Sequence, residues 1–167
     1  MSTAARRSLR TTAAVAIFAA LCLVMHLFVF HVVRVEGTSM AATLNGGDLA
    51  LVTRFDYRLG QPRRGDVVEC RFPGRDATYL KRLIGLPGET VEIIDGRTYI
   101  DGEPISEPYA TGPSEDYRAE LGADEYLVLG DNRSVSYDSR AEDMGMLHRE
   151  DLLGRVRCAL WPFRNIE

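Results

Sequence analysis

The sequence predicts a mainly β protein, with an all-β sandwich or barrel-like domain that follows one N-terminal transmembrane helix. Residues 34–167 contain several short apolar or alternating segments separated by turn residues, a pattern typical of antiparallel sheets. Residues 13–33 form an apolar run of 21 residues. As a helix rising about 1.5 Å per residue, this run is long enough to span a bilayer.

The flanking charges predict how this run is oriented in a membrane. Three arginines and no acidic residue precede it. By the positive-inside tendency, residues 1–12 are expected in the cytoplasm, residues 13–33 in the membrane and residues 34–167 on the extracytoplasmic side. A cleaved signal peptide has a shorter apolar core of about 7–15 residues, so we expect an uncleaved anchor.

Turn residues divide the body of the chain into expected strands. Asp95-Gly96 is a strong two-residue hairpin signal. Residues 106–124 are polar and rich in proline, glycine and acid, which predicts an exposed loop, so a small β insert with its loop is expected over about 90–125. A short helix is expected within 139–153. The expected strands cover residues 49–52, 66–72, 78–84, 90–94, 97–100, 125–129 and 154–161.

Charge and cysteine content exclude several classes of function. Three of the 20 basic residues precede residue 34, so the remaining 134 residues carry 17 basic and 24 acidic ones, a net charge of −7. An acidic body lacks the basic face that nucleic acid requires. The three cysteines form no C-x-x-C pair, so no zinc or redox motif is indicated, and Cys70 and Cys158 are expected to be free buried thiols rather than a disulfide.

Lys81 is the only lysine among the 20 basic residues, and the other 19 are arginines. It lies in the apolar segment 79–84, where burial would lower the pKa of its amine and leave it neutral. Arginine cannot lose its proton in a protein, whereas a desolvated lysine can. A compositional bias toward arginine that spares one surface lysine is the competing explanation, and the neighbouring motifs decide against it.

Ser39 follows the apolar run by six positions, in a turn of small residues that includes Gly37. A neutral lysine can take the proton of a serine hydroxyl as that serine attacks a carbonyl, and backbone N–H groups of such a turn can stabilise the oxyanion. A further hydroxyl would orient the amine without charging it. Residues 130–140 are dense in short polar side chains, lack the spacing of a calcium loop and, taken alone, indicate only a self-capped turn.

Three stretches match, in order, the motifs of one known family. The matching residues are Ser39-Met40 with Thr43-Leu44, then Tyr79-Leu80-Lys81-Arg82 with Gly85-Leu86-Pro87-Gly88, then Gly130-Asp131-Asn132-Arg133 with Ser136, Asp138-Ser139-Arg140 and Gly145. Together they resemble the type I signal peptidases, the Ser–Lys endopeptidases of the bacterial membrane. The resemblance covers residues 10–163, with the anchor in the expected place.

The resemblance implies a role for each matched residue. Ser39 would be the nucleophile, with its N–H donating to the oxyanion, and Lys81 would be the general base. Ser136 would orient the lysine amine, while Asp138 and Arg140 would pair as a structural brace. Shallow pockets for small side chains would be lined by Val35, Met40, Leu44, Tyr79 and Leu80.

The resemblance also implies a substrate and a location. Such enzymes remove signal peptides from secretory preproteins after Ala-x-Ala-like sequences, and the substrate would bind extended beside residues 78–81. The expected location is the bacterial cytoplasmic membrane, in a single-pass topology, where phospholipid would be a partner. No metal, organic cofactor or nucleic acid is implied.

Two positions depart from the family pattern. Ala42 stands where the family usually has proline, so the turn after Ser39 is expected to be less stiff. Gly37 stands where some members carry a serine that donates to the oxyanion, and that donor is missing here.

Three alternatives stay open at this point. A Ser–His–Asp hydrolase would use Ser39, Asp131 and His148, but it needs a β–α alternation that the sequence lacks, and His148 is expected to be exposed. A related Ser–Lys peptidase dedicated to one substrate, such as a pilin or conjugation protein, would share the fold and the dyad. A membrane-tethered, catalytically silent binding module is hinted at only by Ala42.

Overall fold

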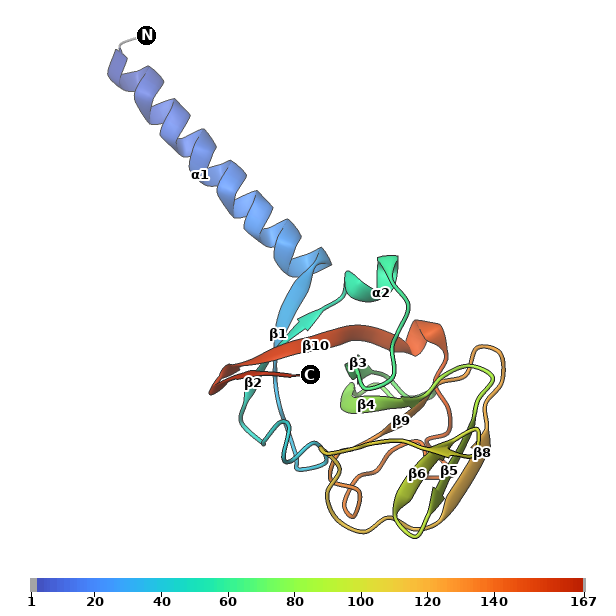
Figure 1. Cartoon of the computed structure of the whole chain (residues 1–167). Coiled ribbons are helices and arrows are strands. Elements are labelled where there is room, and N and C mark those ends of the chain that lie inside the picture. The colour runs from blue at the N-terminus through green and yellow to red at the C-terminus, as the bar shows by residue number, and fades with distance from the viewer. Residues whose placement is uncertain (1–2, 167) are drawn as a thin grey trace.

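A computed structural model describes residues 3–166, with side chains described at 11–23, 29–57 and 60–166. One long helix, α1 (Thr3–Phe28), extends away from a β domain (Figure 1). The other helical segments among the described residues have four residues or fewer. The prediction of a mainly β protein is therefore confirmed.

The N-terminal helix ends earlier than the sequence predicts. The prediction is one helix over residues 13–33, whereas α1 ends at Phe28 and the chain continues as strand β1 (Phe30–Arg34). Valines favour a strand here, and β1 pairs along its whole length with β2 (Leu49–Thr53). Among the described side chains no helix is both long and apolar enough to cross a membrane, so the predicted transmembrane helix is not found.

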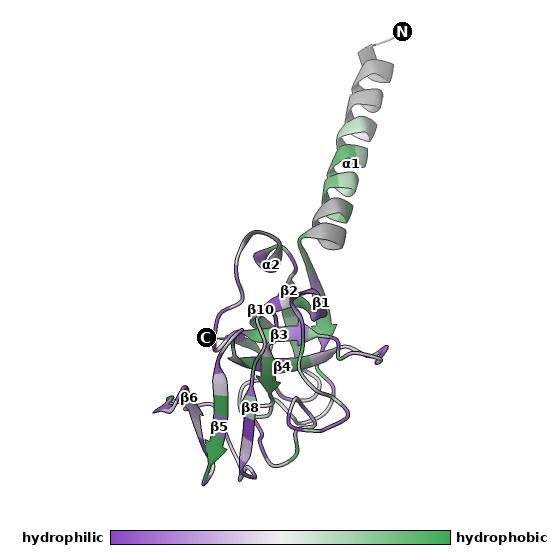
Figure 2. Ribbon diagram, turned by 90° about the vertical axis from the view of Figure 1, so that its right-hand side faces the viewer, coloured by the Kyte–Doolittle hydropathy of each residue, from purple (hydrophilic) through white to green (hydrophobic). Residues whose placement is uncertain are grey.

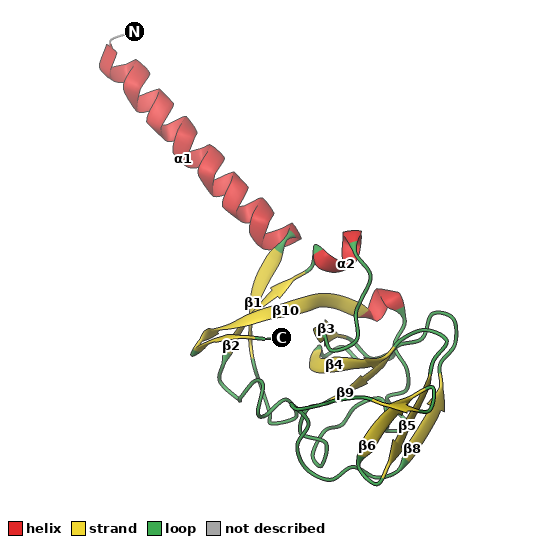
Figure 3. Cartoon of the chain, in the orientation of Figure 1, coloured by secondary structure: helices red, strands yellow, loops and turns green. Residues whose placement is uncertain are grey.

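The larger sheet has seven antiparallel strands and carries the candidate site. Its order is β1-β2-β10-β3-β4-β9, with β11 paired to β10 (Figure 3). β4 lies between β3 and β9, so Lys81 is on an inner strand of the sheet. Its partner in the register of β3 and β4 is Val68. The remaining strands of this sheet are β3 (Val67–Cys70), β4 (Tyr79–Gly85), β9 (Leu127–Leu129), β10 (Leu152–Trp161) and β11 (Phe163–Asn165).

The smaller sheet has four antiparallel strands in the order β7-β6-β5-β8. The hairpin predicted at Asp95-Gly96 joins β5 to β6, and both turn residues have positive φ angles. The loop predicted over 106–124 is wrong in part, because residues 117–120 pair with β5 and turn tyrosine and alanine side chains toward its apolar cluster. The strands are β5 (Thr90–Ile94), β6 (Arg97–Ile100), β7 (Glu103–Pro104) and β8 (Tyr117–Glu120).

Two further expectations concern local structure. The helix predicted within 139–153 is reduced to one 3₁₀ turn, Arg149–Asp151, because the preceding backbone closes a series of separate turns. A single helical turn that the sequence did not predict, α2 (Asp56–Leu59), follows β2. Cys70 and Cys158 are free thiols as predicted, although Cys158 is only half-buried.

The core consists of apolar clusters that anchor the candidate site. One cluster joins residues of β2, β3 and β10 to Val35, Met40 and Leu44, which flank Ser39 in the chain. Another joins β4 and β9 of the larger sheet to β5 and β6 of the smaller one. Figure 2 shows hydrophobic residues concentrated on β3, β4 and β5. The turn after β1 is therefore held in place by buried apolar side chains on both sides of Ser39.

Candidate active site

Ser39 lies in the loop 35–48, which connects β1 to β2. The base of the loop is closed by two backbone hydrogen bonds, from Val35 N to Asp48 O at 2.8 Å and from Gly47 N to Val35 O at 2.9 Å. Within it, Leu44 N donates to Met40 O at 2.7 Å. Since Met40 and Leu44 are buried, the backbone after Ser39 has little freedom to move.

The segment that follows β9 holds the Ser39 backbone from the other side. Asn132 N donates to Ser39 O at 3.0 Å, and Asn132 Nδ2 donates to Thr38 O at 3.3 Å. A Cβ placed on Gly130 would lie 2.6 Å from Ser39 O and 2.2 Å from Ser136 Oγ. The Ser39 backbone and the Ser136 side chain therefore converge on the same glycine.

Lys81 reaches this point from β4. Its side chain is almost fully buried, with 2% of the residue exposed, and its Nζ donates to Ser136 Oγ at 3.0 Å. Burial lowers the pKa of the Lys81 amine below its ordinary value, and the nearby carboxylate of Asp138 opposes this shift only in part. The geometry thus brings together a serine turn, a buried lysine amine with a lowered pKa, and a hydroxyl.

Asp138 and Arg140 form an ion pair beside Gly130. Arg140 donates to both carboxylate oxygens of Asp138, at 2.8 and 2.9 Å, and Gly130 N donates to the same carboxylate at 2.9 Å. Burial alone would raise the pKa of Asp138, but the hydrogen bonds from Arg140 and Ser136 outweigh it and lower that pKa. The Ser136 hydroxyl accepts from Lys81, which leaves the lone pair of a neutral amine free.

We expect Gly130→Ala to abolish most activity without unfolding the domain. The added methyl group would push Ser136 away from Lys81 and the Ser39 carbonyl away from its partner, and misplacement by about 1 Å lowers kcat/KM about 100-fold. The measurement is peptide cleavage beside a thermal unfolding curve. Gly122→Ala is the control, because its new Cβ meets only the flexible side chain of Glu125. Equal activities of the two variants would contradict the conclusion that the Ser39 backbone and the Ser136 side chain must both pack against Gly130.

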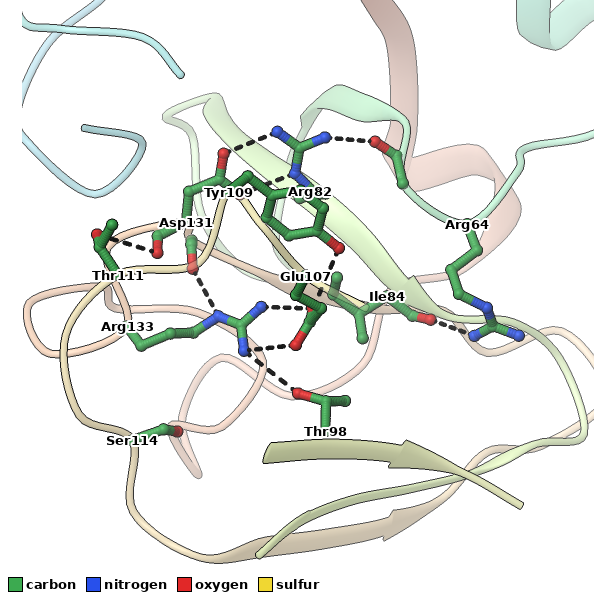
Figure 4. A network of polar contacts seen from close by, with 12 residues as sticks. Arg64, Arg82, Ile84, Thr98, Glu107, Tyr109, Thr111, Ser114, Asp131 and Arg133 are labelled. Atoms are coloured by element: carbon green, nitrogen blue, oxygen red, sulfur yellow. Dashed lines mark hydrogen bonds and ion pairs between the residues drawn. The ribbon is translucent and has the colours of Figure 1, made fainter. Parts of the chain in front are cut away.

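A buried ion pair that sequence reasoning missed fixes the same turn. Arg82 and Asp131 have side chains 1% and 0% exposed, and Arg82 donates to both carboxylate oxygens at 2.8 Å (Figure 4). Thr43, four residues after Ser39, donates to Asp131 at 2.5 Å and accepts from Arg82 at 3.1 Å. The only signal in the sequence is an arginine directly after Lys81 within an apolar strand.

A second ion pair ties the smaller sheet to the site. Arg133 donates to both oxygens of Glu107, at 3.1 and 2.6 Å, and to Thr98 Oγ1 on β6 at 3.3 Å (Figure 4). Arg140 Nη2 donates to the carbonyl of Arg133 at 2.9 Å. The smaller sheet is therefore connected through two arginines to the segment that carries Ser136.

A cleft of about 440 Å³ opens beside Ser39. Four of the five residues predicted to line the substrate pockets are there, but Leu44 is not, because it is fully buried in the core beside Met40. β4 pairs with β9 only from Arg82 onward, so among the described residues no strand pairs with that edge of Tyr79–Lys81. The cleft is lined by Val33, Arg34, Val35, Glu36, Ser39, Met40, Glu69, Ala77, Thr78, Tyr79 and Leu80.

The two positions that depart from the family pattern have unusual backbone angles. Ala42 has φ of +92° and Gly37 has φ of +76°. Proline fixes φ near −65°, so the observed turn after Ser39 has a conformation that proline cannot adopt. Proline could therefore not occupy position 42 without a change in the backbone.

The residues of the alternative triad do not meet. The side chain of His148 is 51% exposed, as predicted, and its Nδ1 lies 3.1 Å from the carbonyl of Asp124. Asp131 is bound to Arg82 and Thr43 instead. The described geometry therefore does not favour a Ser–His–Asp hydrolase.

The chain is similar to known proteins over most of its length. The model of the family "Signal peptidase, peptidase S26" matches residues 8–161. The chain is 36% identical over 157 residues to a signal peptidase I of Leptolyngbya laminosa, across 87% of this chain and 76% of the relative. It is 35% identical over 165 residues to a signal peptidase I of Bacillus licheniformis, across 92% and 88% of the two chains.

A solved structure extends the likeness to the fold. The crystal structure of a signal peptidase I from Enterococcus faecalis has a TM-score of 0.52 and 32% identity, and the match covers 57% of this chain and 96% of that one. The family match covers most of α1, every strand except β11, and every residue gathered around Gly130. The chain belongs to the signal peptidase family, peptidase S26.

Proposed function

We propose that this protein is a membrane-anchored serine endopeptidase that removes signal peptides from secretory preproteins, with Ser39 as nucleophile and Lys81 as general base. One observation carries the proposal: the buried Lys81 amine, bound to Ser136 at 3.0 Å, lies where the Ser39 backbone and Ser136 converge on Gly130. Its pKa is lowered by burial, as a lysine that must act as a base requires.

The reaction would proceed through an ester on Ser39. The neutral Lys81 amine takes the hydroxyl proton as Ser39 Oγ bonds to the carbonyl carbon of the substrate, and the carbonyl electron pair moves onto oxygen, where the Ser39 N–H donates to it. The C–N bond then breaks, and the protonated amine of Lys81 gives its proton to the leaving nitrogen. Water, deprotonated by Lys81, hydrolyses the ester and regenerates the serine.

The pH dependence of cleavage tests the role of Lys81. Burial disfavours the charged amine, so its pKa lies below the ordinary value and the neutral, active form increases as the pH rises through that lowered pKa. We expect kcat/KM to rise through the neutral and mildly alkaline range, as measured with a peptide substrate over a series of buffers. A flat profile over this range would count against a lysine base.

The cleft supports a preference for small residues in an extended substrate. The unpaired edge at Tyr79–Lys81 would accept the substrate as an added strand, and side chains of alternate substrate residues would enter the cleft beside Ser39. Cleavage would thus follow Ala-x-Ala-like sequences.

The N-terminal segment would place the enzyme at the bacterial cytoplasmic membrane. We propose that residues 13–28 of α1 contribute an anchor, with residues 1–12 in the cytoplasm and the β domain, which begins with β1, outside. Support comes from the 21-residue apolar run and from the exposed apolar side chains that α1 carries away from the domain, among them Val15, Ile17, Phe18, Leu21 and Leu23. Phospholipid would then increase cleavage of membrane-inserted preproteins. The test is to measure the cleavage rate while phospholipid vesicles are added in increasing amounts.

A panel of preproteins tests how broad the substrate range is. A general signal peptidase would process several unrelated secretory preproteins in the same preparation. Cleavage restricted to one pilin or conjugation precursor would instead indicate a dedicated peptidase with the same dyad.

A further inference from the structure

A buried acidic side chain lines the cleft beside Ser39. Glu69 lies on β3, and its side chain is 6% exposed. Arg34 and Glu36 also line the cleft but are exposed to solvent. A wall built to receive only alanine-sized apolar side chains has no need of a buried carboxylate, which costs free energy unless it is paired.

The pairing of Glu69 is incomplete. His31 Nε2 on β1 lies 3.0 Å from Glu69 Oε2, but without the alignment of a hydrogen bond. Glu69 Oε2 and His31 Nδ1 have no hydrogen-bond partner among the described residues, although both atoms are buried. The cleft wall therefore contains a carboxylate oxygen that lacks a hydrogen-bond partner among the described residues and is closed to solvent unless the side chain turns toward the cleft.

Glu69 lies on the strand next to β4, the strand whose unpaired edge would accept the substrate. In the register of β3 and β4, Glu69 lies opposite Leu80, so both side chains stand on the same face of the sheet, and both line the cleft. Leu80 belongs to the part of β4 whose other edge is unpaired. A substrate strand added there would run beside Leu80, with Glu69 one strand further across the same face.

We propose that Glu69, positioned by His31, makes the enzyme favour a hydroxyl side chain at one position of the substrate, the third residue before the cleaved bond. This inference rests on the proposed peptidase function. Alternate residues of an extended substrate face the cleft, so residues −1 and −3 enter it. Residue −1 carries the carbonyl that Ser39 attacks and therefore lies against Ser39 and Met40, whereas residue −3 lies about 7 Å further along and reaches the wall formed by Leu80 and Glu69.

Threonine and valine provide the sharpest comparison, because they differ in a hydroxyl and a methyl group at nearly equal volume. A hydrogen bond to a buried carboxylate stabilises the bound substrate, so we expect kcat/KM for a peptide with threonine at −3 to exceed that for valine about tenfold. The measurement uses the full chain in phospholipid and otherwise identical peptides. The same exchange at −1 is expected to show no preference for threonine.

Variants of Glu69 test whether this residue causes the preference for threonine at −3. Glu69→Val should bring the threonine-to-valine ratio to one or below, and Glu69→Gln, which keeps an accepting oxygen, should retain part of it. Glu103→Val removes an exposed acid on β7, which does not line the cleft, and should keep the full preference. Equal cleavage of both peptides by the wild type, or a ratio unchanged in Glu69→Val, would overturn the inference while leaving the proposed function intact. Cleavage of neither peptide nor of an Ala-x-Ala peptide would overturn the proposed function itself.

Discussion

Ser39→Ala and Lys81→Ala are each expected to lower kcat/KM for preprotein cleavage by at least about 10⁴-fold. Ser39→Ala removes the atom that would form the ester, and Lys81→Ala removes the base that would take its proton. The two residues would act as one unit, so the double variant should be no less active than either single one. Cleavage of a model preprotein, followed by gel electrophoresis, measures the loss.

Two controls separate the chemistry from the fold. Lys81→Arg keeps a positive charge that cannot be lost, so it should be as inactive as Lys81→Ala. Arg118→Ala, on the exposed face of the smaller sheet, should cleave like the wild type. Unchanged turnover by Ser39→Ala would mean that another group is the nucleophile, whereas no turnover by the wild type itself would favour the silent binding module.

Arg82→Met is expected to have the largest effect on stability. It leaves the carboxylate of Asp131 buried without its cation, a change that typically costs about 3–5 kcal/mol and lowers the unfolding midpoint by roughly 10 °C or more. Arg82 also donates to the carbonyl of Gly65 at 2.7 Å and stacks over the ring of Tyr109 at 3.8 Å, and both contacts are lost. Thermal unfolding followed by circular dichroism measures the shift.

The matched control is an arginine whose ion pair is exposed. Arg118 pairs with Glu92 and Glu120 at the surface of the smaller sheet, so Arg118→Met should change the midpoint by no more than the error of the measurement. A comparable loss of stability in the two variants would contradict the importance of burial for the Arg82–Asp131 pair.

The strands could be predicted because their signals are local. The hairpin at Asp95-Gly96 and the alternating segment 66–72 carry the turn residues and the period of two that antiparallel strands require. The end of α1 could not be predicted in this way, because residues 30–33 are as apolar as the helix before them. Pairing with β2, a tertiary contact, turns them into a strand.

Around the candidate dyad, too, some residues could be predicted from the sequence and others depend on tertiary contacts. Motif order singled out Ser39, Lys81 and Ser136, and the fold brings the last two into contact and the Ser39 backbone beside them. The role of Arg82 was not accessible, because a buried arginine and a surface arginine look alike in a chain with 19 of them. Leu44 was assigned to the cleft from its motif, whereas its apolar side chain gains more by full burial in the core.

The central claim is that a neutral Lys81 activates Ser39, and acylation of the enzyme tests it most directly. A substrate-like peptide with an activated ester at the cleavage position would be mixed with wild type and with Lys81→Ala at several pH values, and the modified residue would be located by mass spectrometry of protease fragments. The account predicts an acyl group on Ser39 that forms faster as the pH rises in the wild type and does not form above background in Lys81→Ala. Acylation of another residue, or equal acylation of Ser39 in both proteins, would contradict it.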